Sequence, residues 1–348
     1  SNGLPGLTMV GLPETTVKEA RDRVRSALIN SGYAFPAKKI TINLAPADLP
    51  KEGGRYDLPI ALALLVASEQ LNATRLNQYE FVGELALTGG LRGVPGAIPS
   101  AMEAIKAGRR IVVSSDNAAE VGLIGGSDCL VADHLQEVCA FLAGQTSLSP
   151  PLAEAPARDE RYEDLLDVIG QQQGKRALEI VAAGGHNLLL IGPPGTGKTM
   201  LASRLPGLLP PLSNQEALES AAIQSLVNLH TAKTRWRQRP FRAPHHSASL
   251  AAMVGGGSIP VPGEISLAHN GVLFLDELPE FERRGLDALR EPIESGKIHI
   301  SRSRAKIDYP ARFQLIAAMN PSPTGHYQGK HNRASPEQTL RYLGRQIG

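Results

Sequence analysis

The sequence lacks most of the features that mark secreted, membrane-spanning and zinc-binding proteins. Its 348 residues include only two cysteines, Cys129 and Cys139, and no Cys-Cys spacing of the kind that holds a metal. Both cysteines stand in apolar surroundings, so we expect buried, reduced thiols, as in a cytoplasmic protein. No run of about eighteen apolar residues is present, so the expected fold has no membrane-spanning helix. No signal peptide is visible at the start of the chain.

A large excess of one charge is also missing. The formal net charge is +2, so affinity for nucleic acid cannot come from the total and must come from local patches. The contents of 42% hydrophobic and 20% charged residues are typical of a soluble globular protein. A chain of 348 residues is long enough for two domains, each with its own core.

A stretch rich in Pro, Ser, Ala and charge separates the two expected domains. Residues 144–160 have no hydrophobic period and are predicted to form a linker between a domain of residues 1–143 and a domain of residues 161–348. The first domain alternates helices and strands. Its periodicity predicts a helix over residues 14–31, a buried helix over residues 58–71 and a strand over residues 81–87.

Residues 192–199 match the phosphate-binding pattern G-x-x-x-x-G-K-[ST] in full. An apolar run precedes the match and a helix-like segment follows it, which is the context that the pattern requires. Glycines let backbone N–H groups turn toward phosphate oxygens, and the helix N-terminus adds a partial positive charge. We predict that Lys198 reaches the β- and γ-phosphates of ATP and that Thr199 binds Mg²⁺. The full predicted loop is Gly192, Pro193, Pro194, Gly195, Thr196, Gly197, Lys198 and Thr199.

Two later strands are predicted to end in polar side chains beside this loop. Residues 272–275 are apolar and lead into Asp276 and Glu277, a pattern typical of a buried parallel strand whose carboxyl end faces a ligand. We predict that Asp276 holds Mg²⁺ and that Glu277 is the general base that polarises the attacking water. A strand over residues 313–319 ends at Asn320. An asparagine there can be a simple turn residue, but the order of the motifs favours a role in placing the same water.

A short segment before the phosphate loop is the candidate adenine contact. Ile169 and Gly170 precede a helix that continues through residue 182. In a nucleotide-binding domain this position packs against the adenine, and the alternative is an ordinary strand-to-helix turn.

Basic residues without nearby acids form the candidate contact with a polyanion. Residues 220–263 contain no Asp or Glu but carry several basic and aromatic residues, a combination that can pair with phosphates and stack on bases. We take Arg242, His245 and His246 from this window as DNA-binding candidates. The alternative is a solvated basic face.

An expected β-hairpin supplies the remaining candidates. Residues 297–300 and 305–309 alternate in hydrophobicity and are joined by a basic tip. Arg302, Arg304 and Lys306 are predicted to follow a phosphate backbone without reading the bases.

Together these motifs resemble those of AAA+ ATPases of the magnesium-chelatase-like group and, within it, the bacterial competence proteins. Residues 192–199, 242–247, 268–271, 276–280 and 319–321 carry the resemblance. It implies an AAA+ P-loop NTPase three-layer αβα domain with a parallel sheet, and ATP with Mg²⁺ as cofactors. It also implies a homo-oligomeric, hexameric ring. The implied activity is a helicase that acts on single-stranded or branched DNA and drives branch migration during natural transformation.

The first domain resembles the Lon-protease-like fold (ribosomal S5 domain 2-like, α+β) through residues 81–85 and 91–96. Lon-type proteolysis needs a Ser nucleophile with a Lys base. No Ser occurs in residues 53–57, where the nucleophile would fall, and Pro99 stands where the Lys would fall. We therefore expect a non-proteolytic scaffold or DNA-contacting domain. The resemblance also implies that the chain begins after the first strand of this fold and ends before the arginine finger and the helical lid.

Two activities other than a DNA motor are compatible with an AAA+ domain. One is a chelatase-type remodeller that acts on a protein partner, and the other is a peptidase with an attached ATPase. The basic segments favour the DNA motor over the first alternative, and the missing Ser and Lys argue against the second. Salt-dependent binding of DNA distinguishes the motor from the remodeller.

Overall fold

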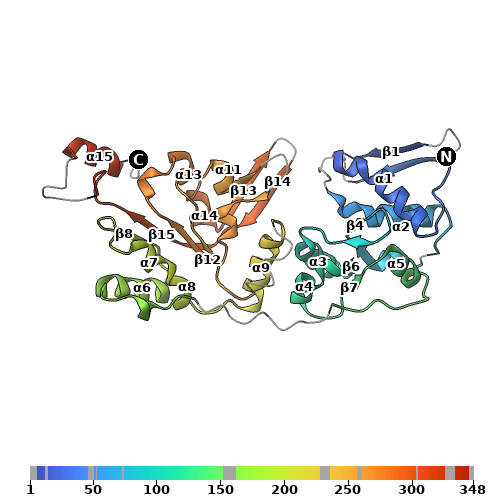
Figure 1. The fold of residues 1–348 in the computed structure, drawn as a ribbon, viewed down its shortest axis with the longest axis horizontal. Coiled ribbons are helices and arrows are strands. Elements are labelled where there is room, and N and C mark those ends of the chain that lie inside the picture. The colour runs from blue at the N-terminus through green and yellow to red at the C-terminus, as the bar shows by residue number, and fades with distance from the viewer. Residues whose placement is uncertain are drawn as a thin grey trace. The chain divides into compact units, whose positions relative to one another are not determined.

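A computed structural model describes residues 6–11, 15–45, 51, 53–72, 74–151, 162–227, 236–256, 261–302, 305–325 and 334–344 (Figure 1). The chain divides into two compact units. The first consists of Ser1–Ala157, Ala221–Trp236 and Arg302–Ala305, and the second of Arg158–Ser220, Arg237–Ser301 and Lys306–Gly348, so helix α9 (Asn214–Ser225) is divided between them. The finer boundaries of the expected linker, at residues 144 and 160, stay predictions.

The first unit is a mixed α/β unit with short sheets. Strands β3, β6 and β7 form a parallel sheet, β1 pairs in parallel with β2, and β4 pairs antiparallel with β5. Its principal elements are β1 (Gly6–Val10), α1 (Thr15–Asn30), β2 (Lys39–Asn43), α2 (Asp57–Ala67), β3 (Tyr79–Phe81), β4 (Glu84–Leu85), β5 (Leu91–Arg92), α3 (Ala97–Lys106), β6 (Arg110–Ser114), α4 (Ala118–Val121), β7 (Cys129–Ala132) and α5 (Leu135–Leu142).

Helices α1 and α2 share the main core of this unit and are joined by a buried ion pair. The Leu-rich face of α2 packs against the apolar side of α1. Asp57, fully buried at the start of α2, accepts two hydrogen bonds from the Arg23 guanidinium at 2.7 and 3.0 Å. Burial raises the pKa of Asp57 although Arg23 works to lower it, so this pair ties the two helices together while desolvation opposes the charged carboxylate.

Two predictions in this unit need correction. The strand expected over residues 81–87 is wrong, because the chain leaves the β3 alignment at Gly83. There the Gly83 N–H donates to the Arg55 carbonyl and the Gly83 carbonyl accepts from Leu58 N–H, both at 3.2 Å, so β4 starts a separate hairpin. The helix expected to reach residue 71 ends at Ala67, since Glu69 adopts a positive φ of 61°.

Both cysteines are buried free thiols, as expected. Cys129 lies in β7 and Cys139 in α5. Burial raises the pKa of Cys129 to about 11, so this thiol stays protonated at neutral pH.

The second unit is built on a four-stranded sheet in the order β8-β15-β12-β9, and every pair in it is parallel. The strands are β8 (Leu188–Ile191), β9 (Phe241–Arg242), β12 (Gly271–Leu275) and β15 (Phe313–Met319). All five residues of β12 are buried, so its two faces are both covered, as the apolar run predicted. The parallel arrangement places the carboxyl ends of β8, β12 and β15 at one edge of the sheet.

Helices cover both sides of this sheet. Figure 1 shows α6, α7 and α8 on one side and α11, α13 and α14 on the other. Val272 and Phe274 point into the first layer, where they pack with Leu178, Leu201 and Leu205. The remaining principal elements are α6 (Gln172–Gly184), α7 (Lys198–Ser203), α8 (Leu205–Leu208), α9 (Asn214–Ser225), α11 (Leu250–Val254), β10 (Gly255–Gly256), β11 (Val261–Pro262), α12 (Glu264–Leu267), α13 (Arg283–Asp287), α14 (Arg290–Ser295), β13 (Lys297–Arg302), β14 (Ala305–Pro310) and α15 (Pro336–Gly344).

The hairpin predicted between β12 and β15 is confirmed as the two-stranded sheet β13-β14. His299 and Asp308 face each other across it, with Nδ1 and Oδ1 2.5 Å apart. In the described part of the chain, no helix is both long and apolar enough to cross a membrane.

Candidate nucleotide-hydrolysis site

The predicted phosphate loop connects β8 to α7 at the carboxyl edge of the sheet. Gly195 and Gly197 have positive φ angles of 77° and 80°, which favour glycine and turn the backbone of the loop. The Thr196 hydroxyl donates to the Pro193 carbonyl at 2.9 Å, and Gly192 N–H donates to the Met319 carbonyl at 3.3 Å. These bonds fix the loop to itself and to β15.

Lys198 is the first residue of α7, and its side chain folds back over the loop. Its ammonium group donates to the carbonyl oxygens of Gly192 at 2.7 Å and Pro193 at 2.8 Å, and to Asn320 Oδ1 at 3.2 Å. Burial lowers the pKa of Lys198, and the nearby Asp276 carboxylate partly offsets that effect. The cation is thus held where a phosphate group on the loop would meet it, as the motif requires.

Thr199 and Asp276 form the pair expected to bind Mg²⁺. The Thr199 hydroxyl donates to Asp276 Oδ2 at 2.6 Å, although 77 residues separate the two in sequence. A hydroxyl and a carboxylate are the hard oxygen ligands that Mg²⁺ takes in proteins, usually together with water and substrate phosphates. The two residues therefore fit the ion, which when bound would neutralise charge on the phosphate groups.

Glu277 follows β12 directly and contacts a histidine that the sequence did not link to it. It adopts a positive φ of 53°, which turns its side chain out of the strand direction. His246 Nδ1 lies 3.1 Å from Glu277 Oε2, and the His246 ring packs edge-on against Phe281. Because β9 and β12 are parallel neighbours, the segment after β9 passes next to the end of β12. His246, predicted as a DNA contact, thus lies against the predicted base.

Asn320 lies at the end of β15 beside Lys198, as the order of the motifs predicted. Tyr342 of α15 is buried, and its hydroxyl is hydrogen-bonded to the backbone of Asn320. Burial raises the pKa of Tyr342, and Glu280 and Glu277 add to that effect. No local motif pointed to Tyr342, because α15 lies outside the motifs and brings this side chain to the site through tertiary packing.

The adenine candidates precede α6. Ile169 is 95% exposed, which leaves its side chain open to a ligand, and Gly170 has a positive φ of 74°. The next residue, Gln171, also has a positive φ, and its side-chain amide donates to the Thr196 carbonyl at 2.8 Å. Gln171, which no motif identified, therefore joins this segment to the phosphate loop.

The DNA candidates have different surroundings. Arg242 at the end of β9 makes a bidentate ion pair with Glu264, with both N–O distances 2.6 Å. His245 Nδ1 lies 2.7 Å from the Ser247 hydroxyl, and its ring lies 4.1 Å from that of His246, centroid to centroid. Arg304 and the side chains of Arg302 and Lys306 lie outside the described residues. The DNA contacts themselves stay predictions.

Comparison with known proteins agrees with this geometry. The sequence model described as "Magnesium chelatase, subunit ChlI" matches residues 164–348, and the one described as "Subunit ChlI of Mg-chelatase" matches residues 1–117. The chain is 80% identical to YifB of Salmonella typhimurium and 78% identical to YifB of Escherichia coli, in each case over 348 residues. It is 62% identical over 355 residues to the competence protein ComM of Haemophilus influenzae. Each match spans 100% of this chain and 69% of the relative. This chain belongs to the magnesium chelatase subunit ChlI family.

Proposed function

We propose that this chain is the ATP-hydrolysing part of a DNA motor that promotes branch migration on single-stranded or branched DNA. The observation that carries the hydrolysis part is the pairing of Thr199 with Asp276 at 2.6 Å, beside Lys198 and next to Glu277. ATP would lie on the phosphate loop, and Mg²⁺ would be held by Thr199 and Asp276. Glu277 would then accept a proton from the attacking water.

The DNA part of the proposal is supported by the hairpin and by a relative. Strands β13 and β14 pair with each other, and the sequence at their junction carries Arg302, Arg304 and Lys306. The 62% identical relative is named a competence protein, and competence is the capacity to take up DNA. A tip of this charge would contact phosphates rather than bases.

Two further features belong to the same proposal. The chain would act as a homo-oligomeric ring, hexameric as in other AAA+ ATPases and located in the cytoplasm, in which the hairpins face a central channel. The first unit would be a non-proteolytic scaffold of the Lon-like type. In support of its lack of proteolysis, the position expected for a nucleophile is filled by Gly53 through Asp57, and Asp57 is committed to Arg23.

The second candidate function is a remodeller of a protein partner, as the family description suggests. Such an enzyme would share the hydrolysis site, so the site does not separate the two. What separates them is the response of hydrolysis to DNA.

The test is the ATPase rate without DNA and with linear single strands, duplex and four-way junctions, each at two salt concentrations. A motor predicts stimulation that fades as salt rises, because phosphate contacts release counterions. Replacing Arg302 and Arg304 by Ala should remove the stimulation. The matched control replaces Lys106 and Arg109, two exposed basic residues of the first unit in surface ion pairs, and should keep it. If the ATPase rate of the wild type does not change when DNA is added, the protein remodeller is favoured.

A further inference from the structure

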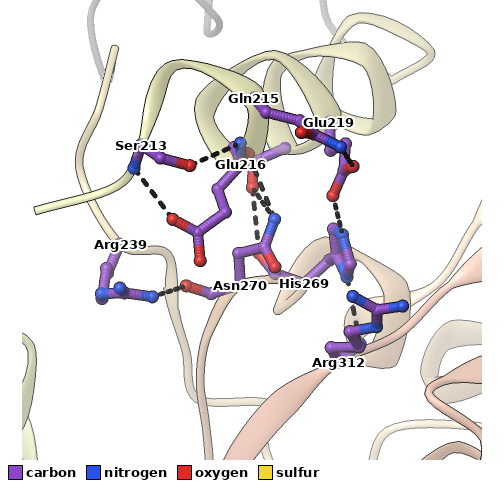
Figure 2. Close-up of polar contacts among 9 residues, drawn as sticks. Ser213, Gln215, Glu216, Glu219, Arg239, His269, Asn270 and Arg312 are labelled. Atoms are coloured by element: carbon purple, nitrogen blue, oxygen red, sulfur yellow. Dashed lines mark hydrogen bonds and ion pairs between the residues drawn. The ribbon is translucent and has the colours of Figure 1, made fainter.

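A polar cluster lies at the amino-terminal edge of the four-stranded sheet, the edge opposite the phosphate loop. Figure 2 shows its polar contacts. The cluster joins helix α9 to the residues that precede β9, β12 and β15. We call it the His269 cluster, which consists of Glu216, Glu219, Ser220, Arg239, His269, Asn270 and Arg312. His269 and Asn270 belong to the segment 268–271, one of those that carry the family resemblance.

His269 is the buried centre of the cluster, with a side chain only 2% exposed. Its Nδ1 accepts a hydrogen bond from Arg312 N–H at 3.0 Å, so Nε2 carries the proton and faces Glu219 Oε2 at 3.3 Å. Its carbonyl accepts from the Ser220 hydroxyl at 3.1 Å. Burial lowers the pKa of His269 against the opposing effect of Glu219, so the neutral ring that suits both bonds is favoured. One side chain thus connects α9 to the start of β15.

Asn270 holds the same elements through its backbone and its amide. Its φ of 60° lies in the left-handed region, which asparagine tolerates better than most residues. Its N–H donates to the Arg312 carbonyl at 2.6 Å, and its carbonyl accepts from Arg239 Nη1 at 2.8 Å. Its side-chain amide donates to the Glu216 carbonyl of α9 at 3.1 Å. The amino ends of β9, β12 and β15 therefore all meet α9 here.

The strand that follows, β12, is tightly packed where it leaves this cluster. A Cβ on Gly271 would overlap the Pro240 carbonyl oxygen, and Val272 N–H donates to that oxygen at 2.7 Å. Strand β12 is buried along its length and pairs with β15 throughout and with β9 at Val272 and Leu273. It ends at Leu275, and the next residue, Asp276, lies roughly 20 Å from His269 at about 3.3 Å per residue. Close-packed interiors have low compressibility and transmit strain, so a displacement at one end of β12 is expected to be felt at the other.

Space for such a displacement exists beside α9. A cavity of about 590 Å³ is lined by residues of the cluster and by the first turn of the helix. That turn is closed by a capping box, in which Ser213 N–H donates to Glu216 Oε2 at 2.8 Å and Glu216 N–H donates to the Ser213 hydroxyl at 3.2 Å. The first turn of the helix, which lines the cavity, therefore carries its own N-terminal cap.

We propose that His269 is a positioning residue for hydrolysis, through which helix α9 sets the placement of Asp276 and Glu277. The proposal rests on the ATPase activity proposed above. Its alternative is a purely structural role, in which the cluster only stabilises the unit.

The test compares two variants with a control of similar structural cost. His269→Phe keeps a ring and removes both nitrogens. Glu219→Gln changes a residue whose side chain is 34% exposed and is the milder variant should His269→Phe not fold. Ser249→Ala removes the N-cap of α11, which lies outside the cluster, and serves as the control. Each protein is assayed for kcat, KM and thermal unfolding, and for hydrogen exchange of the amides of residues 276–281.

We expect both cluster variants to lower kcat about tenfold at unchanged KM, since small displacements of catalytic groups are costly. We also expect faster hydrogen exchange at residues 276–281 in both cluster variants. Ser249→Ala should show neither the lower kcat nor the faster exchange, even when it loses as much thermal stability as the cluster variants do. Unchanged kcat and exchange in both cluster variants would overturn the proposal, as would equal changes in the control. If the wild type hydrolyses no ATP, the proposed ATPase function is wrong. If hydrogen exchange at residues 276–281 is nevertheless faster in the cluster variants and not in Ser249→Ala, the link between His269 and these residues is still supported.

Discussion

The contact between His246 and Glu277 can be removed while an aromatic ring is kept at position 246. His246→Phe keeps an aromatic ring against Phe281, whose centroid lies 6.5 Å away, and deletes the nitrogen that faces Glu277 Oε2 at 3.1 Å. That nitrogen occupies one carboxylate oxygen of the predicted general base. Once it is gone, Glu277 is free to face the attacking water, so we expect the basal rate of ATP hydrolysis to rise.

The size of the rise follows from the exposure of the two side chains. His246 is 32% exposed and Glu277 is 55% exposed, so water competes for both partners. Exposed pairs of this kind contribute about 0.2–1 kcal/mol. Since about 1.4 kcal/mol corresponds to a tenfold change in rate, the expected increase lies between roughly 1.4-fold and fivefold.

The assay is phosphate release at saturating ATP and Mg²⁺, with nucleotide affinity measured in parallel. His245→Phe is the matched control, because His245 contacts Ser247 rather than Glu277. Its rate should stay at the wild-type value, and both variants should bind nucleotide normally. A fall in kcat for His246→Phe would refute the reasoning, since it would mean that His246 holds Glu277 in its working position.

Three further predictions concern single residues. Lys198→Ala should weaken ATP binding by roughly 10- to 100-fold in a nucleotide titration, the value of a charge-assisted contact, and a wild-type affinity would remove Lys198 from the site. Glu277→Gln should bind ATP normally while kcat falls roughly 10²–10⁴-fold, and normal turnover would exclude Glu277 as base. Burial raises the pKa of Glu120 to about 7, so between pH 4.5 and 7 the folded state retains a proton that the unfolded state loses, and stability falls as pH rises. By pH 8 this deprotonation lowers the free energy of unfolding by about 3 kcal/mol. Glu120→Gln has no carboxylate to titrate, so in urea unfolding of the first unit its free energy of unfolding should not show this loss between pH 5 and pH 8. Parallel pH profiles for the variant and the wild type would contradict the burial argument.

The parts of the site that local patterns define could be predicted from the sequence. The phosphate loop carries its own glycines and lysine, and the apolar run before Asp276 indicates a strand buried on both faces. Both motifs lie at strand ends, and in a parallel sheet such ends share one edge. That rule places Thr199 and Asp276 at the same edge, where they meet across 77 residues of sequence.

The contacts that depend on strand order and register could not be predicted in this way. His246 reaches Glu277 only because Phe241 pairs with Val272 and Arg242 with Leu273, and nothing in either segment specifies that register. Tyr342 reaches the site through the packing of a helix that follows β15 at some distance along the chain. Gly83 ends β3 because its N–H and carbonyl bind residues 55 and 58, which is a tertiary effect that overrides the strand pattern.

Arg242 shows why a count of charges along the chain is a weak guide to a nucleic-acid surface. The acid-free window ends at residue 263, and Glu264, the next residue, neutralises Arg242 with two bonds of 2.6 Å. A phosphate would have to displace this carboxylate to reach Arg242, whereas the tip of the β13–β14 hairpin carries its arginines with no acidic residue between 295 and 307. The hairpin is therefore the better place to look for a DNA contact. Because β14 leads through residues 311 and 312 into β15, a force on the hairpin would reach Arg312, and with it His269, before it reached the hydrolysis site.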